Sequence, residues 1–275
     1  MEEISSFSGQ HIFPSVTSLT LSTGSNVRLD TTALLNSLER LPSLETVFIE
    51  FRARWTPIPT TGDRIVTLPN LRRMSLTSKN DTSDARMGPI LVGLHLPKLE
   101  RLEVHSDSTL ESNGPCFPLS FPNLLPNFSE LPKAIIVLGP RSYKIHFQNE
   151  YKHALEITVG RLSNFDETRK LLGGLPLRFV RSLIVGFAEK SDREFLFGML
   201  GVMDGVEDLE VMGDWTQLLQ FWCGCRERER LCPALRNLTV YGGEDPGREL
   251  TVFEDARHAI GVPLTTTNFL RGEGD

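Results

Sequence analysis

The chain has 275 residues, 40% of them hydrophobic and 23% charged, which predicts a soluble globular protein with a sizeable core. Its formal net charge is −6, with Arg and Lys scattered between acids, and this argues against nucleic-acid binding, which needs a concentrated basic surface. The first ten residues lack the regions of a secretory signal, and no apolar run reaches the roughly 18 residues of a membrane helix.

A nine-residue phrase recurs through the first hundred residues: apolar, Pro, x, apolar, x, x, apolar, x, apolar. It occupies residues 13–21, 41–49, 68–76 and 96–104, so its period is 28, 27 and 28 residues. A fixed period in this range is typical of stacked repeat proteins. The alternation at the end of each phrase predicts a short strand with one buried face.

Between these strands the apolar spacing becomes helical. Asp30 can cap a helix whose apolar residues Leu34, Leu35, Leu38 and Leu41 share a face, and a second helix is expected within 84–96. Residues 55–67 favour a loop. Strand and helix in alternation predict a parallel sheet with helices on one side. Because strands lie about 4.8 Å apart and packed helices about 8–10 Å, stacked units should curve with the sheet on the concave side.

The period breaks after residue 104. Residues 107–150 contain six prolines and favour an irregular insertion, with candidate hairpin strands at 134–138 and 143–147. The pattern then returns. We expect strands at 155–157, 180–185, 206–211 and 235–240, helices at 163–172, 191–200 and 215–230, and a short helix at 252–260.

The expected organisation is one domain. Residues 1–12 form a lead-in, 13–264 a leucine-rich-repeat-like α/β solenoid with its insertion at about 107–150, and 265–275 a loose tail.

No catalytic or cofactor motif stands out: there is no nucleophile elbow, phosphate loop, dinucleotide fingerprint or zinc-protease motif. Cys223, Cys225 and Cys232 cluster, but no fourth ligand at a zinc spacing accompanies them. We therefore expect buried, reduced cysteines, no metal or cofactor, and a cytoplasmic or nuclear location.

The remaining candidate site is the concave sheet face, where the residues between the buried positions of each strand point outward. They mix arginine, aromatic and acidic side chains, as partner-binding surfaces do. The predicted set is Phe48, Arg73, Ser75, Arg101, Glu103, His105, Glu156, Asp208, Glu210, Asn237 and Tyr241.

The repeated phrase resembles the leucine-rich repeat, whose core L-x-x-L-x-L is matched by Leu71, Met74 and Leu76. The places where that repeat carries Asn or Cys hold Gly24, Arg52, Lys79 and Asp107, so the solenoid should lack the usual side-chain ladder. The degenerate x-Pro-x-Leu phrases look like those of the large fungal families of F-box proteins with leucine-rich repeats.

In those families the F-box binds a cullin-ligase adaptor and the repeats capture the protein to be ubiquitinated. Only twelve residues precede Phe13, too few for a helical F-box, so the resemblance implies substrate recognition without adaptor binding. The leading hypothesis is a non-enzymatic recognition module for a protein partner. The alternatives are a repeat scaffold unrelated to ubiquitination, and an enzyme with its site in the 107–150 insertion.

Overall fold

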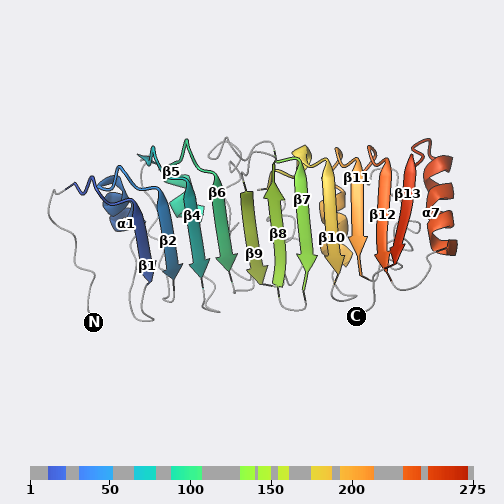
Figure 1. Ribbon diagram of the computed structural model, residues 1–275, viewed down its shortest axis with the longest axis horizontal. Helices are drawn as coiled ribbons and strands as arrows, with labels where there is room; N and C mark the ends of the chain where they lie inside the picture. Colours follow the sequence, from blue (N-terminus) through green and yellow to red (C-terminus); the bar gives the residue numbers. More distant parts are fainter. Residues whose placement is uncertain are drawn as a thin grey trace. The chain divides into compact units, whose positions relative to one another are not determined.

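The computed structural model describes residues 12–22, 31–51, 65–78, 88–106, 131–139, 142–149, 154–160, 175–187, 193–213, 232–242 and 247–271. The protein is α/β, with mostly parallel strands and few helices (Figure 1). It forms two compact units. Unit 1 comprises residues 1–129 and 150–175, and unit 2 comprises residues 130–149 and 176–275.

Five strands in the described part of unit 1 are parallel and lie side by side in the large sheet. In spatial order they are β1 (Ser18–Ser22), β2 (Thr46–Phe51), β4 (Arg73–Ser78), β6 (Arg101–Ser106) and β9 (Ala154–Gly160). Their register aligns equivalent places in the repeated phrase: Leu19 pairs with Val47, then Met74, Leu102 and Leu155. The predicted strands of this unit and their alignment are confirmed.

The described connections between these strands contain two short helices. Helix α1 (Thr31–Glu39) buries Leu34, Leu35 and Leu38, as its spacing predicts. Helix α2 (Gly88–Val92) ends earlier than the predicted 84–96, because Leu94–His95 instead form the short strand β5. Strand β5 pairs with β3 (Val66–Thr67), so the loop predicted for 55–67 gives way to a strand at its last two residues.

The described residues of unit 2 form six strands, which include the predicted hairpin. In spatial order they are β8 (Ser142–Gln148), β7 (Lys133–Leu138), β10 (Ser182–Phe187), β11 (Asp208–Met212), β12 (Asn237–Gly242) and β13 (Thr266–Arg271). All are parallel except β8, which runs antiparallel to β7. The hairpin turn is tight: the Gly139 N–H donates to the Ser142 carbonyl at 3.0 Å, and a Cβ at Gly139 would lie 3.0 Å from that oxygen.

The pairing of strands departs from chain order in both units: β9 pairs with β6 in unit 1, and β10 pairs with β7 in unit 2. Unit 2 also corrects one expectation. The tail predicted to be loose from residue 265 forms β13, because the N–H groups of Thr265 and Thr266 donate to the Arg236 carbonyl and the chain then pairs with β12.

The described helical segments of unit 2 are η2 (Leu177–Phe179), α5 (Arg193–Leu200) and α7 (Gly247–Ala259). Helix α5 confirms the prediction for 191–200, and α7 is longer than the predicted 252–260. The helices expected at 163–172 and 215–230, and residues 107–130 of the insertion, lie outside the described residues.

In each unit the strands bury one face, because alternate residues along them are apolar. In unit 1 the residues of the two central columns are at most 2% exposed: Val47, Met74, Leu102 and Leu155, then Ile49, Leu76, Val104 and Ile157. Unit 2 has equally buried columns of Leu183, Leu209 and Leu238, then Val185, Val211 and Val240. The intervening residues are half-buried or exposed, so the strands of each unit have an open face.

Main-chain hydrogen bonds link neighbouring strands at their N-terminal ends. The carbonyl of Thr17, directly before β1, accepts hydrogen bonds from Glu45 N at 2.8 Å and Thr46 N at 3.0 Å. The carbonyls of Glu45 and Arg72 each accept two N–H groups of the next strand in the same way. In unit 2 the carbonyls before β7, β10, β11 and β12 repeat this double acceptance.

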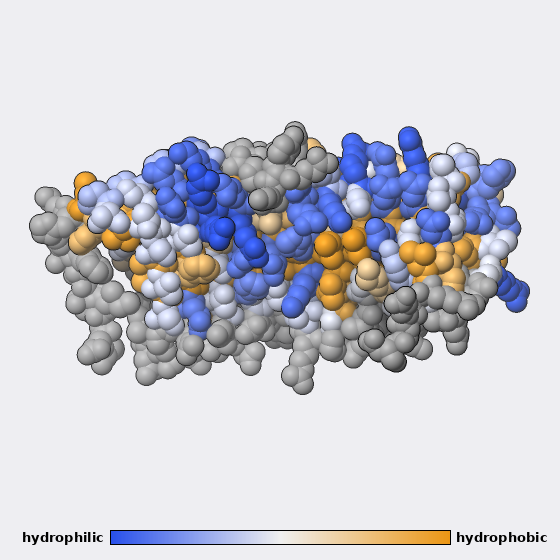
Figure 2. Space-filling model, in the orientation of Figure 1, coloured by the Kyte–Doolittle hydropathy of each residue, from blue (hydrophilic) through white to orange (hydrophobic). Residues whose placement is uncertain are grey.

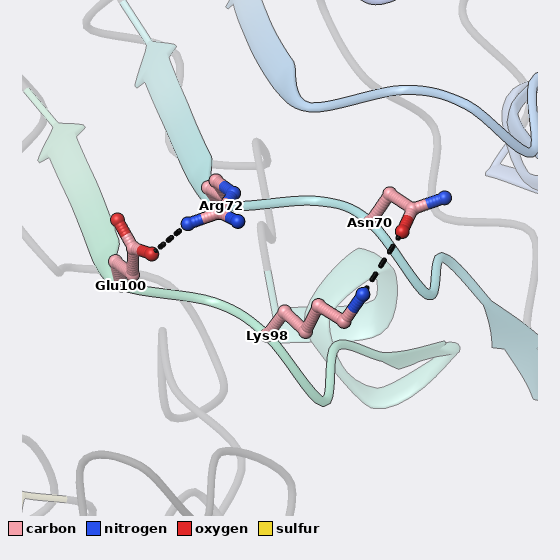
Figure 3. Close-up of polar contacts among 4 residues, drawn as sticks. All are labelled: Asn70, Arg72, Lys98 and Glu100. Carbon is pink, nitrogen blue, oxygen red and sulfur yellow. Dashed lines mark hydrogen bonds and ion pairs between the residues drawn. The ribbon is translucent and has the colours of Figure 1, made fainter.

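Polar side chains reinforce these junctions in unit 1 (Figure 3). The Asn70 amide donates to the Pro42 carbonyl at 3.2 Å, and Lys98 Nζ donates to Asn70 Oδ1 at 3.1 Å. Arg72 pairs with Glu100 at 2.5 Å. The positions where the leucine-rich repeat carries its Asn or Cys lie outside the described residues. A polar ladder is therefore present before the strands, where the sequence did not predict one.

Candidate functional site

The open face of unit 1 carries all seven of the site residues predicted there. The register places Arg73 beside Arg101, and Ser75 beside Glu103, which in turn neighbours Glu156. His105 lies farther along β6, and Phe48 on β2 is 43% exposed. The predicted residues of this unit therefore form one continuous surface of aligned strands.

Charges on this face partly neutralise one another. Arg101 Nε lies 2.6 Å from Glu103 Oε1, and its NH2 group lies 3.7 Å from Glu156 Oε2. Arg73 is exposed and takes part in none of the ion pairs between described residues. The cation of Arg73, which no described acid neutralises, and the partly exposed ring of Phe48 are thus available to a partner.

The other four predicted residues lie on the open face of unit 2. Asn237 Nδ2 donates to Asp208 Oδ1 at 2.6 Å, and the Tyr241 hydroxyl donates to Glu210 Oε2 at 3.2 Å. The Glu210 carboxylate raises the pKa of Tyr241 because it disfavours a phenolate beside it. Tyr241 therefore stays a neutral donor, and neither Asp208 nor Glu210 forms an ion pair with a described residue.

The sequence did not identify an apolar part of this second face. It consists of Ile135 and Val137 on β7, Ile184 and Gly186 on β10, and Met212 on β11, and is called the apolar strip below. Val137 is 45% exposed and Met212 42% exposed. Figure 2 shows hydrophobic surface gathered over β7 and β10, with hydrophilic surface around it. The signal in the sequence was the unbroken apolar run at 134–138, which leaves apolar side chains on both faces of one strand.

Two further features bear on chemistry. Among the described residues no group of three or more His, Cys, Asp or Glu side chains could hold a metal ion. No helix in the described part of the chain is long and apolar enough to cross a membrane.

Cys232 is fully buried, as predicted, and its Sγ lies 3.7 Å from the Leu200 carbonyl; Cys116, Cys223 and Cys225 lie outside the described residues.

The thiol of Cys232 should be unreactive in the folded protein. Burial raises the pKa of Cys232 to about 12, and only the thiolate is a good nucleophile. We expect iodoacetamide at pH 8 to label Cys232 in the denatured chain but not in the native chain, as measured by peptide-mapping mass spectrometry. Rapid native labelling at this residue would contradict its burial.

The same shift gives stability a pH dependence. Because the pKa of Cys232 is higher in the folded chain, the thiol's contribution to the free energy of unfolding is fully present below the unfolded pKa of about 8.5. It is lost as the pH rises towards 12. Between pH 8 and 11, the free energy of unfolding measured in urea should therefore fall more steeply for the native sequence than for Cys232→Ala.

Comparisons with protein-family models, with curated proteins and with solved structures found no match to this chain.

Proposed function

We propose that the chain is a non-enzymatic protein-recognition module, built as a leucine-rich-repeat-like solenoid. The observation that supports it is the register of the parallel strands, which brings exposed side chains far apart in sequence into adjacent rows. Arg73 and Arg101 are neighbours in one such row although 28 residues separate them. Extended sheet surfaces of this kind are commonly used by solenoids to bind partners.

The composition of the face agrees with recognition of a protein. Exposed Phe48 provides an aromatic anchor, and Arg73 provides a cation with acidic residues nearby. Aromatic and arginine side chains carry much of the binding energy at protein interfaces. No catalytic role is assigned to any residue of this face.

The proposed partner is a protein destined for ubiquitination, as in the F-box families that the repeated phrases resemble. Support for this part comes from the phrases at 41–49, 68–76 and 96–104, whose strands align in the sheet. A repeat scaffold unrelated to ubiquitination would use the same face but would not associate with ligase subunits.

Site-specific photo-cross-linking tests the proposal. A benzoyl-phenylalanine at Phe48 should yield a discrete cross-linked protein in a native cell extract, and mass spectrometry should identify it. The matched control is the same residue at Val252, which is 47% exposed on α7. Arg73→Ala with Arg101→Ala should abolish the Phe48 product.

Four results decide the outcome. Equal cross-linking from Phe48 and Val252, or a product insensitive to the alanine substitutions, would count against recognition by this face. Recovery of adaptor and cullin subunits with the product would favour the ligase role, and their consistent absence would favour the scaffold.

A further inference from the structure

The apolar strip on the open face of unit 2 contains a hollow. The register places Gly186 directly between Val137 and Met212. A Cβ added at Gly186 would meet only the Ile136 carbonyl at 3.9 Å and Val137 Cγ2 at 4.0 Å. With adjacent strands about 4.8 Å apart, Val137 and Met212 lie roughly 10 Å from each other, and no side chain of a described residue lies between them at this level of the sheet. The opening has the width of one apolar side chain.

Opposite charges lie on the two sides of this strip. Lys133 on β7 and Lys144 on β8 lie on one side, and Asp208 and Glu210 on β11 lie on the other. None of the four forms an ion pair with a described residue. This differs from unit 1, where Arg101 is held by Glu103 and Glu156. Asp208 and Glu210 accept hydrogen bonds from the neutral Asn237 and Tyr241, which leave their negative charge in place next to the exposed apolar surface, where it can pair with a ligand.

We infer that this face binds a protein segment with an acidic, an apolar and a basic side chain in that order. The apolar side chain fills the hollow above Gly186, the acidic one faces Lys144, which the register places level with Gly186, and the basic one faces Asp208 and Glu210. This inference rests on the proposed recognition function and specifies the chemistry of the partner.

The geometry also sets the spacing of the segment. Lys144 on β8 and the carboxylates on β11 lie three strand spacings apart, which is about 14 Å, and the long lysine side chain reaches across part of that distance. An extended chain advances about 3.3 Å per residue, so the acidic and basic residues should be three or four positions apart. A nucleic acid or an anionic lipid surface would find cations on only one side of the strip and carboxylates on the other.

The test uses the full chain and a phage-displayed library of random 12-residue peptides. We expect enriched peptides to carry an acidic and a basic residue three or four positions apart around an apolar one. Synthetic peptides should lose at least tenfold in affinity, measured by fluorescence anisotropy, to Gly186→Leu and to Asp208→Lys with Glu210→Lys. Replacing the peptide's basic residue by Glu should restore binding to the lysine variant.

Control variants separate binding from folding. Gly186→Ala places no atom closer than 3.9 Å to a neighbour, so it should fold normally and weaken binding less than Gly186→Leu. Asp255→Lys changes a charge on the exposed surface of α7 and should leave affinity unchanged. Circular dichroism and the unfolding midpoint confirm that each variant is folded.

Several outcomes would overturn the inference. The first is a failure to enrich peptides, and the second is equal peptide binding by the Asp208→Lys/Glu210→Lys variant. The third is self-association of the chain that this variant abolishes, because a second copy of the chain would then be the occupant of the strip. The Phe48 cross-link tests unit 1 and does not depend on any of these three outcomes. If the peptide test fails and the Phe48 cross-link still forms, only the inference about unit 2 is overturned. If the Phe48 cross-link does not form, the proposed recognition function is itself contradicted.

Discussion

Replacing Arg257 with alanine should lower the free energy of unfolding by roughly 3–5 kcal/mol. Arg257 lies on α7 and is 2% exposed. Its guanidinium donates to the carbonyls of Cys232 at 3.2 Å, Leu235 at 2.9 Å and Val262 at 3.1 Å. Alanine would leave these acceptors without their charged donor, so α7 would lose its attachment to the chain on either side of β12. Urea unfolding followed by circular dichroism measures the loss.

Two control variants define the origin of that loss. Arg248→Ala removes an exposed arginine from the same helix and should change stability by less than about 0.5 kcal/mol. Arg257→Lys keeps the charge but not the planar fork of donors, so it should recover only part of the stability. A full recovery by lysine would mean that charge alone, and not the three directed hydrogen bonds, stabilises this region. Burial also lowers the pKa of Arg257, but arginine remains protonated at neutral pH.

Leu102→Ala should destabilise the protein by about 2–5 kcal/mol, because it removes a fully buried side chain from the centre of β6. Phe48→Ala removes a larger side chain from β2 but on the open face, and should cost no more than about 1 kcal/mol. Thermal and urea unfolding of the two variants compare the two faces directly. A larger loss from Phe48→Ala would reverse the assignment of buried and open faces in unit 1.

Much of the local structure follows from the sequence because each unit repeats the same alternation. A strand with apolar residues at every second position has one stable orientation, so the buried faces of β2, β4 and β6 could be predicted from Val47, Met74 and Leu102. The register followed from the period, because equivalent phrases align side by side. The candidate site residues followed as the complement of the buried set.

Other features could not be predicted, each for a physical reason. Apolar alternation indicates which face of a strand is buried but not which strand pairs with it, so the pairing of β10 with β7 was not evident. Strand β13 lacks the proline phrase and reads as polar sequence, although backbone pairing with β12 needs no particular side chains. The apolar strip was missed because the run at 134–138 has no alternation to separate its two faces.

Carbonyl groups that directly precede strands each accept two N–H hydrogen bonds, and this affects which substitutions the sequence can tolerate. The hydrogen bonds at Thr17, Glu45 and Arg72 are made by main-chain groups. Nearly any amino acid can therefore occupy these junctions without breaking the hydrogen bonds. Proline is the exception, because it has no N–H to donate. Saturation mutagenesis at residues 45, 46, 72 and 73 should therefore give broad tolerance with a sharp exclusion of proline. Such a protein can diversify its open surface while its neighbouring strands stay connected.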